Sequence, residues 1–505
     1  MTRFFLLPCV GAALVWWPAP LRAERINHAG RILGPALTVN RPTLFNTPEA
    51  DAILASLLIF PPNNPWNEDI SRRPLLTNSE AMIARIASDL SSSRRTLRAF
   101  EEMNFVLVPD SQPMVPIQFV DYADESDPSP YPIPSNMPVE TWPSQTGSLT
   151  LEEWQRDLSG DGGDRHAIIV RPGTGHLWEM WQAKLVGADW QASNGAKFDL
   201  NSNALRPAGW TSGDAAGLPM FPALVRYDEC QRGAVEHACR IVVAKTRRAY
   251  IYPATHYAST IPATETNVPA MGQRLRLKSS FVIPTDWTKE EKAVLAALKK
   301  YGALVADNGG FFSISITPDD RWPADAFRHL ATVGITNFEV VQTTGPTEGP
   351  RSAGAPVANA GADFTAGIGV PVPLQGFVAF TGAAPEVRWR CYSGPGPVTF
   401  SDAGLTNSAV TFAAPGVYTL MLSAEDTVHT PSYDALVVTV SAGLRASLAL
   451  SGTQLLLSWS GGSPPFLVEN SASPFGPWHQ LYTGNDDHIL LSVGESHSFY
   501  RVSGK

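Results

Sequence analysis

The stretch TTGPTEGPRSAGAP, residues 343–356, divides this chain of 505 residues into two parts of different character. Its glycines, prolines and small polar residues offer nothing to bury, which is typical of a linker between domains. Before it the sequence mixes helical and strand patterns, whereas after it nearly every pattern is that of a β-strand. We therefore expect a mainly β, multidomain protein. It comprises a large β-rich unit with peripheral helices at 24–342, a linker at 343–354, and two further β units at 355–441 and 442–505.

The unit after the linker carries a run of short motifs. These are PVANAGAD at 356–363, PLQG at 373–376, VRW at 387–389, GPG at 394–396 and GVYTL at 416–420. Alternating apolar residues, with a turn signal about every ten residues, predict an immunoglobulin-like β-sandwich. Taken together the motifs resemble a PKD domain, and this resemblance implies the same sandwich. The sequence departs from that family around Val428–Tyr433. In this fold Trp389 is expected in the core.

Residues 442–505 have the rhythm of short strands. The segments LLLSW at 455–459, FLVE at 466–469 and FYRV at 499–502 resemble the fibronectin-type-III-like modules that end many exported bacterial proteins. The resemblance implies a spacing, docking or tethering role rather than catalysis.

Two helices are signalled in the large unit. Thr77–Glu80 forms a capping box before an apolar face of Met82, Ile83, Ile86 and Leu90. Thr288–Glu291 forms a second capping box, and Gly302 ends the helix that follows it.

The remainder of the large unit has strand patterns. The expected strands are Phe105–Val108, Ile117–Asp121, His166–Arg171, Leu177–Gln182, Ala238–Ala244, Ala249–Tyr252 and Leu275–Val282. Asp307–Gly310, with the sequence DNGG between two apolar runs, predicts a hairpin turn. A long Pro-rich loop at Asp127–Pro138 is the kind of segment on which binding surfaces are found.

The first 23 residues predict a secretion signal. Arg3 supplies a positive charge, Phe4–Trp17 is an uncharged apolar run, and Ala23 offers a cleavage position. The run of 14 residues is shorter than the roughly 20 that cross a bilayer, so cleavage is favoured over an uncleaved anchor. We expect a secreted, extracellular or periplasmic protein.

The net charge of −9, with 17% charged residues and no basic run, argues against nucleic acid or anionic lipid as a partner. We expect a monomer.

Three cysteines follow the predicted signal. Cys230 and Cys239 are close enough in sequence to pair as a disulfide across a short loop in an exported protein. Their spacing is not that of a zinc site. Cys391 is left over, and we expect it to be buried on a strand.

Aromatic and histidine side chains gather in the middle of the large unit. His166, His176, His237 and His256 lie between Asp164 and His256, and Trp142, Trp154, Trp178, Trp181, Trp190 and Trp210 lie in or just before that segment. Aromatic faces stack on sugar rings, so these residues point to a polysaccharide or cell-surface glycan as partner. Trp178, Trp181, Trp210, His256 and Arg240 are the candidate substrate-binding residues. The alternative is that about half of the tryptophans are packed in the core.

Candidate catalytic groups are Glu179, Asp214, Asp228 (or its neighbour Glu229) and His237. Strand alternation places Glu179 on the same face as Leu177 and Trp181, where an apolar setting raises the pKa of a carboxyl as a general acid requires. A second carboxylate would complete a glycosidase pair. The competing interpretation is that each carboxylate forms an ion pair with arginine.

The loop WTSGDAAGLP, residues 210–219, is rich in small residues. It presents Asp214 at its tip to a ligand, or else it is a tight turn in which Asp214 caps backbone N–H groups.

No cofactor is expected. Asp164 and His166 lie on one strand face, but the spacing of known zinc sites is absent. The acidic loop DLSGDGGD at Asp157–Asp164 is compatible with a structural calcium ion, although its spacing is not that of an EF-hand.

These patterns favour a secreted carbohydrate-active enzyme, with a polysaccharide hydrolase using paired carboxylates as the first hypothesis. The alternatives are a non-catalytic carbohydrate-binding or adhesion protein, and a polysaccharide lyase using His237, Arg240, His256 and Tyr257. Residues 24–342 also resemble a family of exported bacterial proteins, but that resemblance transfers no activity and no site residue.

Overall fold

The computed structural model describes residues 24–156, 163–342, 354–462, 464–492 and 498–504. The chain is mainly β, as predicted. The expected signal peptide at 1–23 and nearly all of the linker lie outside the described residues. Within the described residues no helix has the length and apolar character needed to traverse a bilayer.

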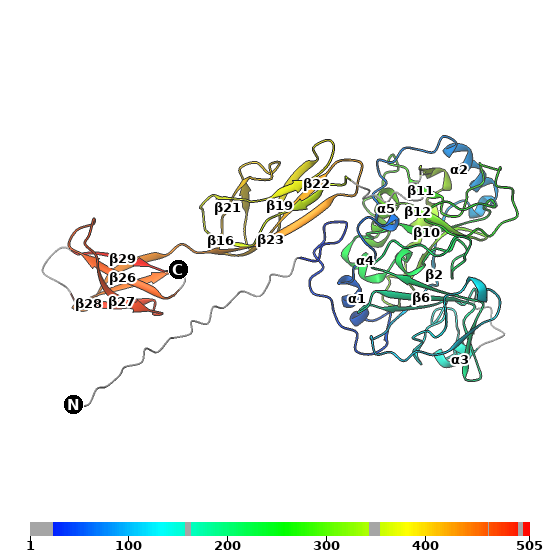
Figure 1. Cartoon of the computed structure of the whole chain (residues 1–505), viewed down its shortest axis with the longest axis horizontal. Coiled ribbons are helices and arrows are strands. Elements are labelled where there is room, and N and C mark those ends of the chain that lie inside the picture. The colour runs from blue at the N-terminus through cyan, green and yellow to red at the C-terminus, as the bar shows by residue number, and fades with distance from the viewer. Residues whose placement is uncertain (1–23, 157–162, 343–353, 463, 493–497, 505) are drawn as a thin grey trace, which may run out of the picture.

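The large N-terminal unit is built on two main sheets and one small sheet (Figure 1). In spatial order, the six-stranded sheet consists of β14 (Phe338–Val340), β11 (Arg274–Leu277), β12 (Ala303–Asn308), β10 (Cys239–Val243), β13 (Phe312–Ile316) and β2 (Leu97–Glu101). The five-stranded sheet consists of β1 (Thr43–Leu44), β3 (Val106–Leu107), β5 (Ala167–Arg171), β6 (His176–Trp181) and β9 (Asn194–Asp199). The small sheet consists of β4 (Ile117–Phe119), β8 (Asp189–Ala192) and β7 (Lys184–Val186).

Short helices accompany these sheets. The α-helices are α1 (Pro48–Ala55), α2 (Ser79–Ser88), α3 (Leu151–Arg156), α4 (Tyr227–Arg232) and α5 (Lys289–Lys300). The 3-10 helices are η1 (Pro65–Asn67), η2 (Ser92–Arg94), η3 (Ala123–Glu125), η4 (Phe221–Ala223), η5 (Arg328–Thr332) and η6 (Ile335–Asn337).

Both predicted helices are confirmed. Thr288 and Glu291 form the reciprocal capping box that starts α5, and Gly302 follows the helix with a φ of 68° that favours glycine. The predicted apolar face of α2 is buried at Met82, Ile83 and Ile86. Its capping box is absent, because the N-cap position is taken by Asn78, whose side chain caps no N–H group.

The five-stranded sheet is buried on both faces. Ile168, Val170 and Leu177 join the main core, which also takes in the six-stranded sheet and its helices. Trp178 and Met180 join a second core with residues of β4 and β8. The alternation along β6 therefore directs Glu179 to the same side as Leu177, towards the main core.

The hairpin predicted at Asp307–Gly310 is wrong. β12 and β13 do not pair with each other, because both pair with β10, which lies between them. Val242 is opposite Asp307 on one side and Ser313 on the other. The connection from β12 to β13 therefore crosses the end of β10. The strand expected at Ala249–Tyr252 is also absent, and only an isolated bridge joins Tyr250 to Met271.

The second unit is an immunoglobulin-like sandwich. Its four-stranded sheet consists of β16 (Phe364–Gly367), β23 (Ser432–Ser441), β22 (Gly416–Glu425) and β19 (Glu386–Ser393). The opposing strands are β17 (Val372–Pro373), β21 (Ala409–Phe412) and β20 (Val398–Phe400), and β15 (Val357–Asn359) pairs with β18 (Phe377–Ala379).

Two features of this unit are hallmarks of the immunoglobulin-like fold. Trp389 on β19 is 1% exposed, which confirms it as a core residue. The Tyr418 hydroxyl donates to the Ala414 carbonyl four residues upstream at 2.8 Å, forming a tyrosine corner. Cys391 lies on β19 as expected, but it is exposed rather than buried.

The C-terminal unit has two three-stranded sheets. One consists of β24 (Arg445–Ser451), β25 (Gln454–Ser460) and β28 (His488–Ser492), and the other of β27 (His479–Gly484), β26 (Phe466–Ser471) and β29 (Phe499–Ser503). Its small core contains Leu457, Trp459, Phe466 and Val468. The three strands predicted from the sequence are all present.

Candidate functional site

A polar cleft lies where the β12–β13 connection crosses the end of β10. Its volume is about 240 Å³. The lining comes from β2 and the residues after it, a loop residue at position 140, the residues just before β5, strands β10 and β13, the end of β12 and the β12–β13 connection. The crossover brings acidic residues from distant parts of the chain, Glu102, Glu140 and Asp307, to one surface.

Glu140 and His166 form a buried ion pair in this cleft. Glu140 Oε2 accepts from the His166 backbone N–H at 3.1 Å and lies 3.0 Å from Nδ1, while Nε2 lies 2.8 Å from the Gly213 carbonyl. Because both ring nitrogens face acceptors, both carry hydrogen and the imidazole is positively charged.

The pKa values of the pair agree with that charge state. Burial opposes protonation of His166, but the charge and hydrogen bond of Glu140 outweigh it and raise the His166 pKa to about 9. Burial likewise disfavours the ionised form of Glu140, but His166 holds the Glu140 pKa below its ordinary value. Glu140 is therefore a carboxylate at neutral pH.

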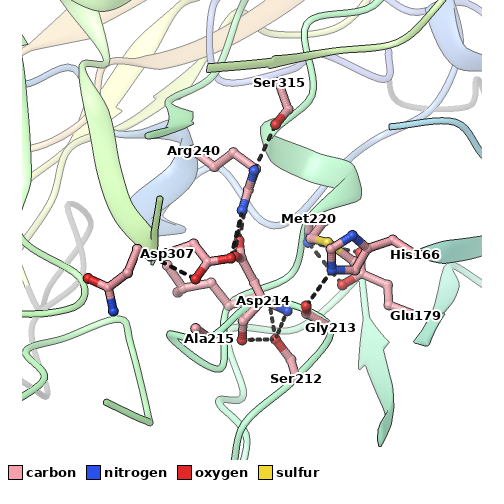
Figure 2. A network of polar contacts seen from close by, with 12 residues as sticks. His166, Glu179, Ser212, Gly213, Asp214, Ala215, Met220, Arg240, Asp307 and Ser315 are labelled. Carbon is pink, nitrogen blue, oxygen red and sulfur yellow. Dashed lines mark hydrogen bonds and ion pairs between the residues drawn. The ribbon is translucent and has the colours of Figure 1, made fainter. Parts of the chain in front are cut away.

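Arg240 connects the cleft to the loop beneath it. Its Nη2 and Nε donate to the two carboxylate oxygens of Asp214 at 2.7 and 3.0 Å, and its Nη1 donates to the Ser315 hydroxyl at 2.7 Å. Figure 2 shows Arg240 extending from Ser315 to Asp214, with Asp307 beside it. This bidentate pairing fixes the guanidinium plane.

Two further acids of the cleft have pKa values raised to near neutral, so each is about half protonated at pH 7. Burial, followed by the charge of Glu140, raises the Glu102 pKa to about 7. Burial, followed by the charge of Asp214, raises the Asp307 pKa to about 7. The Ser315 hydroxyl donates to Glu102 Oε1 at 3.2 Å. The cleft therefore combines an ionised carboxylate with carboxyls able to donate a proton, which is the requirement for general acid–base chemistry.

The structure places Glu179 and Asp214 behind the cleft rather than on an open surface. Glu179 is fully buried and accepts from the backbone N–H groups of Met220 and Phe221 at 2.9 Å. Burial raises its pKa to about 7 even though these N–H groups favour the ionised form. The prediction of a raised pKa in an apolar setting agrees with this, but Glu179 has no route to a substrate in the cleft.

The loop at residues 210–219 does not present Asp214 to a ligand. Asp214 is fully buried, and the loop turns inward so that its carboxylate meets Arg240. The Ser212 hydroxyl bonds to the Asp214 backbone, and Gly213 packs against His166 and Glu179 (Figure 2). The interpretation in which this loop displays an exposed acid is wrong, because the arginine beneath it binds the acid.

Asp228 and His237 lie away from the cleft. Asp228 and Glu229 belong to α4 rather than to a strand end, and Asp228 pairs with Arg232 at 2.6 Å. His237 Nε2 lies 3.1 Å from Glu229 Oε2. Glu229 also pairs with Arg226 at 2.6 Å, so both carboxylates form the arginine ion pairs that were the alternative to catalysis.

The predicted substrate-binding residues do not form one aromatic surface. Trp178 is 4% exposed in the second core. Trp181 packs against Tyr122, Trp210 lies near Arg206, and the ring of His256 binds the Ala215 carbonyl at 2.7 Å. None of these four residues lines the cleft. Of the site residues predicted from the sequence, Arg240 does line it.

Cys230 and Cys239 are buried free thiols, so the predicted disulfide is not formed in the structure. Burial raises the pKa of both thiols, that of Cys239 to about 12. Both side chains pack in the main core.

The described residues contain no cluster of three or more side chains arranged to hold a metal ion. Most of the predicted calcium loop, residues 157–162, lies outside the described residues. Asp164 is exposed and His166 is committed to Glu140, so this pair does not act as a metal-ligand set.

Sequence reasoning missed Glu102, Glu140 and Asp307. Glu140 follows the Pro-rich loop Asp127–Pro138, the kind of segment on which binding surfaces are expected. Asp307 belongs to the segment predicted as a turn, and Glu102 follows directly on β2. The neighbouring sequence of each residue gives no sign that the three lie together. They are brought close because the β12–β13 connection crosses the end of β10.

No protein-family model and no curated protein matches the chain. Three solved structures similar to parts of it have TM-scores of 0.16 to 0.17. The PKD domain from KIAA 1837 protein is 24% identical, covering 20% of this chain and 99% of its own. A PKD domain from human KIAA0319 is 17% identical, covering 22% and 100%. A nucleoside hydrolase-related hypothetical protein from Saccharophagus degradans is 14% identical, covering 29% and 36%. The sandwich assignment here rests on strand pairing and the tyrosine corner.

Proposed function

We propose that this protein is an exported polysaccharide hydrolase whose active site is the cleft at the end of β10. One observation carries the proposal. A carboxyl with a pKa of about 7, Glu102, shares a cleft with a carboxylate held ionised, Glu140. Two carboxyl groups in opposite protonation states are the chemical requirement of glycoside hydrolysis.

In this proposal Glu102 is the general acid and donates its proton to the glycosidic oxygen as the bond to the leaving sugar breaks. Glu140 is either the base that takes a proton from the attacking water molecule or the nucleophile that attacks the sugar itself. The Glu140 Oε2 atom is occupied by His166, and Oε1 takes no hydrogen bond among the residues that the structure describes. That oxygen is therefore free for a water molecule or for the sugar. Arg240 positions Ser315, whose hydroxyl donates to Glu102.

The appended units and the predicted signal at residues 1–23 support export, and the immunoglobulin-like sandwich and C-terminal unit suit spacing or tethering to a glycan surface.

The test is release of sugars by the protein lacking residues 1–23 from a broad panel of polysaccharides, measured as new reducing ends. We expect Glu102→Gln and Glu140→Gln each to lower the rate at least 100-fold. Glu152→Gln, on the exposed face of α3, is the matched control and should retain the full rate. Absence of any sugar release across the panel, or retention of activity in both cleft variants, would overturn the proposal.

A non-catalytic glycan-binding protein is the second candidate. It is favoured by the pairing of Asp214 and Asp228 with arginines, which leaves these two predicted acids without a catalytic role. Glycan binding without any sugar release would identify this alternative. The lyase set has no such support, since His237 pairs with Glu229 while Arg240 pairs with Asp214.

A further inference from the structure

We propose that the cleft accepts polysaccharides whose sugars carry no anionic group and excludes acidic ones such as uronate or sulfated chains. This inference rests on the proposed function in taking the cleft as the glycan site. It concerns binding, so it can be tested separately from hydrolysis.

The cleft lining holds more acidic groups than cations. Four carboxyl groups line it, those of Glu102, Glu140, Asp164 and Asp307, against two cations, His166 and Arg240. Asp214 adds a fifth acid directly behind Arg240. Acids outnumber cations in and behind the lining, so the cleft is net negative once Glu102 and Asp307, whose pKa values are about 7, ionise. A net negative cleft repels ligands of the same sign.

The two cations are already engaged. Both ring nitrogens of His166 face Glu140 and Gly213. Arg240 donates to both oxygens of Asp214 and to Ser315, and its Nη2 also lies 3.7 Å from Asp307 Oδ2. His166 therefore has no free N–H for a substrate carboxylate or sulfate, and the charge of Arg240, which is 2% exposed, is already matched by the carboxylate of Asp214.

One wall of the cleft is apolar and aromatic. Phe100 and Phe311 both line it, with ring centroids 5.2 Å apart and planes at 80°. Arg94 lies over Phe311 at 4.3 Å and donates to the Gly310 carbonyl, but it is not part of the lining. Aromatic rings suit the C–H faces of uncharged sugars and supply no countercharge to an acidic one.

Asp307 is the residue at which the charge of the cleft can be changed without altering the proposed acid, Glu102, or the proposed base, Glu140. Asp307 Oδ1 accepts from the Asn308 backbone N–H at 2.7 Å, and an asparagine amide oxygen can keep that contact. Asp307→Asn therefore removes the negative charge that Asp307 carries above its pKa of about 7, while retaining the local hydrogen bond.

The experiment compares binding of polysaccharides that share a backbone and differ in charge. The pairs are hydroxyethyl with carboxymethyl cellulose, methyl-esterified with de-esterified polygalacturonan, and dextran with dextran sulfate. Affinity electrophoresis and calorimetry are carried out at pH 8 and low ionic strength with the Glu102→Gln protein, which lacks the proposed acid but keeps the Glu140–His166 pair. For a backbone that binds, we expect the neutral member to bind at least tenfold more tightly, with the ratio shrinking as salt is added. Asp307→Asn and the exposed Asp164→Asn should each reduce the ratio, and Asp487→Asn in the C-terminal unit should not.

Equal or tighter binding of the acidic members, or no binding of either member of any pair, overturns this inference. Selective binding of neutral chains with no hydrolysis by the unmodified protein would instead overturn only the proposed function, so the two failures are distinguishable.

Discussion

One carboxylate oxygen of Glu140 contacts His166 at two points, accepting from its backbone N–H at 3.1 Å and from its ring Nδ1 at 3.0 Å. The contact fixes the start of β5 against the loop that carries Glu140. It also sets the charge of both side chains and leaves the other carboxylate oxygen to the cleft.

The first prediction concerns the stability of this pair. The folded pKa of His166, about 9, lies above its ordinary value of 6.5. Its contribution to stability is therefore fully present below pH 6.5 and is lost as the pH rises through about 9. In denaturation followed by tryptophan fluorescence, the unmodified protein should lose more stability between pH 6.5 and 9.5 than His166→Gln. Parallel pH profiles for the two proteins would contradict the ion pair.

The second prediction concerns the pH dependence of activity. The proposed acid Glu102 must be protonated and Glu140 ionised, so kcat/KM should fall as the pH rises through about 7. It should persist below the ordinary carboxyl range, because the Glu140 pKa is lowered. A substrate whose leaving group needs no proton, such as a dinitrophenyl glycoside, should restore the rate of Glu102→Gln but not that of Glu140→Gln. Failure of that rescue would remove Glu102 from its proposed role.

The third prediction concerns Asp214 and Arg240, whose side chains are 0% and 2% exposed. Asp214→Asn leaves the buried guanidinium with no charged partner directly bonded to it. We expect a loss of about 3–5 kcal/mol in the free energy of unfolding. The matched control is Asp487→Asn, which removes an exposed pair with His488 and should change stability by less than about 0.5 kcal/mol. A change as small for Asp214→Asn would show that the pair does not hold the loop.

The fourth prediction concerns Glu179, whose folded pKa of about 7 exceeds its ordinary value of 4.5. A raised carboxyl pKa gives a contribution that is present below pH 4.5 and is lost as the pH rises through about 7. Glutamine keeps an oxygen for the Met220 and Phe221 N–H groups and does not ionise. Glu179→Gln should therefore match the unmodified protein at pH 4.5 and exceed it at pH 8, by a difference on the order of 3 kcal/mol. A difference that does not grow with pH would contradict the burial of an ionisable group here.

Several features were predictable because they depend on neighbours in the sequence. The capping box at Thr288, the left-handed glycine at Gly302 and the alternation that buries Trp389 are fixed by residues within one helix turn or a few strand positions. The same alternation correctly indicated an apolar setting and a raised pKa for Glu179. It could not tell whether the apolar side was a cleft or a core.

The site itself was not predictable in this way. DNGG at Asp307–Gly310 has the composition of a hairpin turn, but β10 lies between the two strands that it joins. Nothing within those four residues records that insertion, since it depends on β10, more than sixty positions earlier in the chain. The cleft acids and their altered pKa values follow from that crossing.

The sequence by itself therefore determined that this chain is mainly β, that helices α2 and α5 form, and that Trp389 lies in a sandwich core, because such features arise from short-range backbone and burial preferences. Only the tertiary structure decided which acids meet. Glu102, Glu140 and Asp307 share a cleft, while Asp214 and Asp228 are bound by arginines, because burial and charge pairing depend on contacts between residues far apart in the chain.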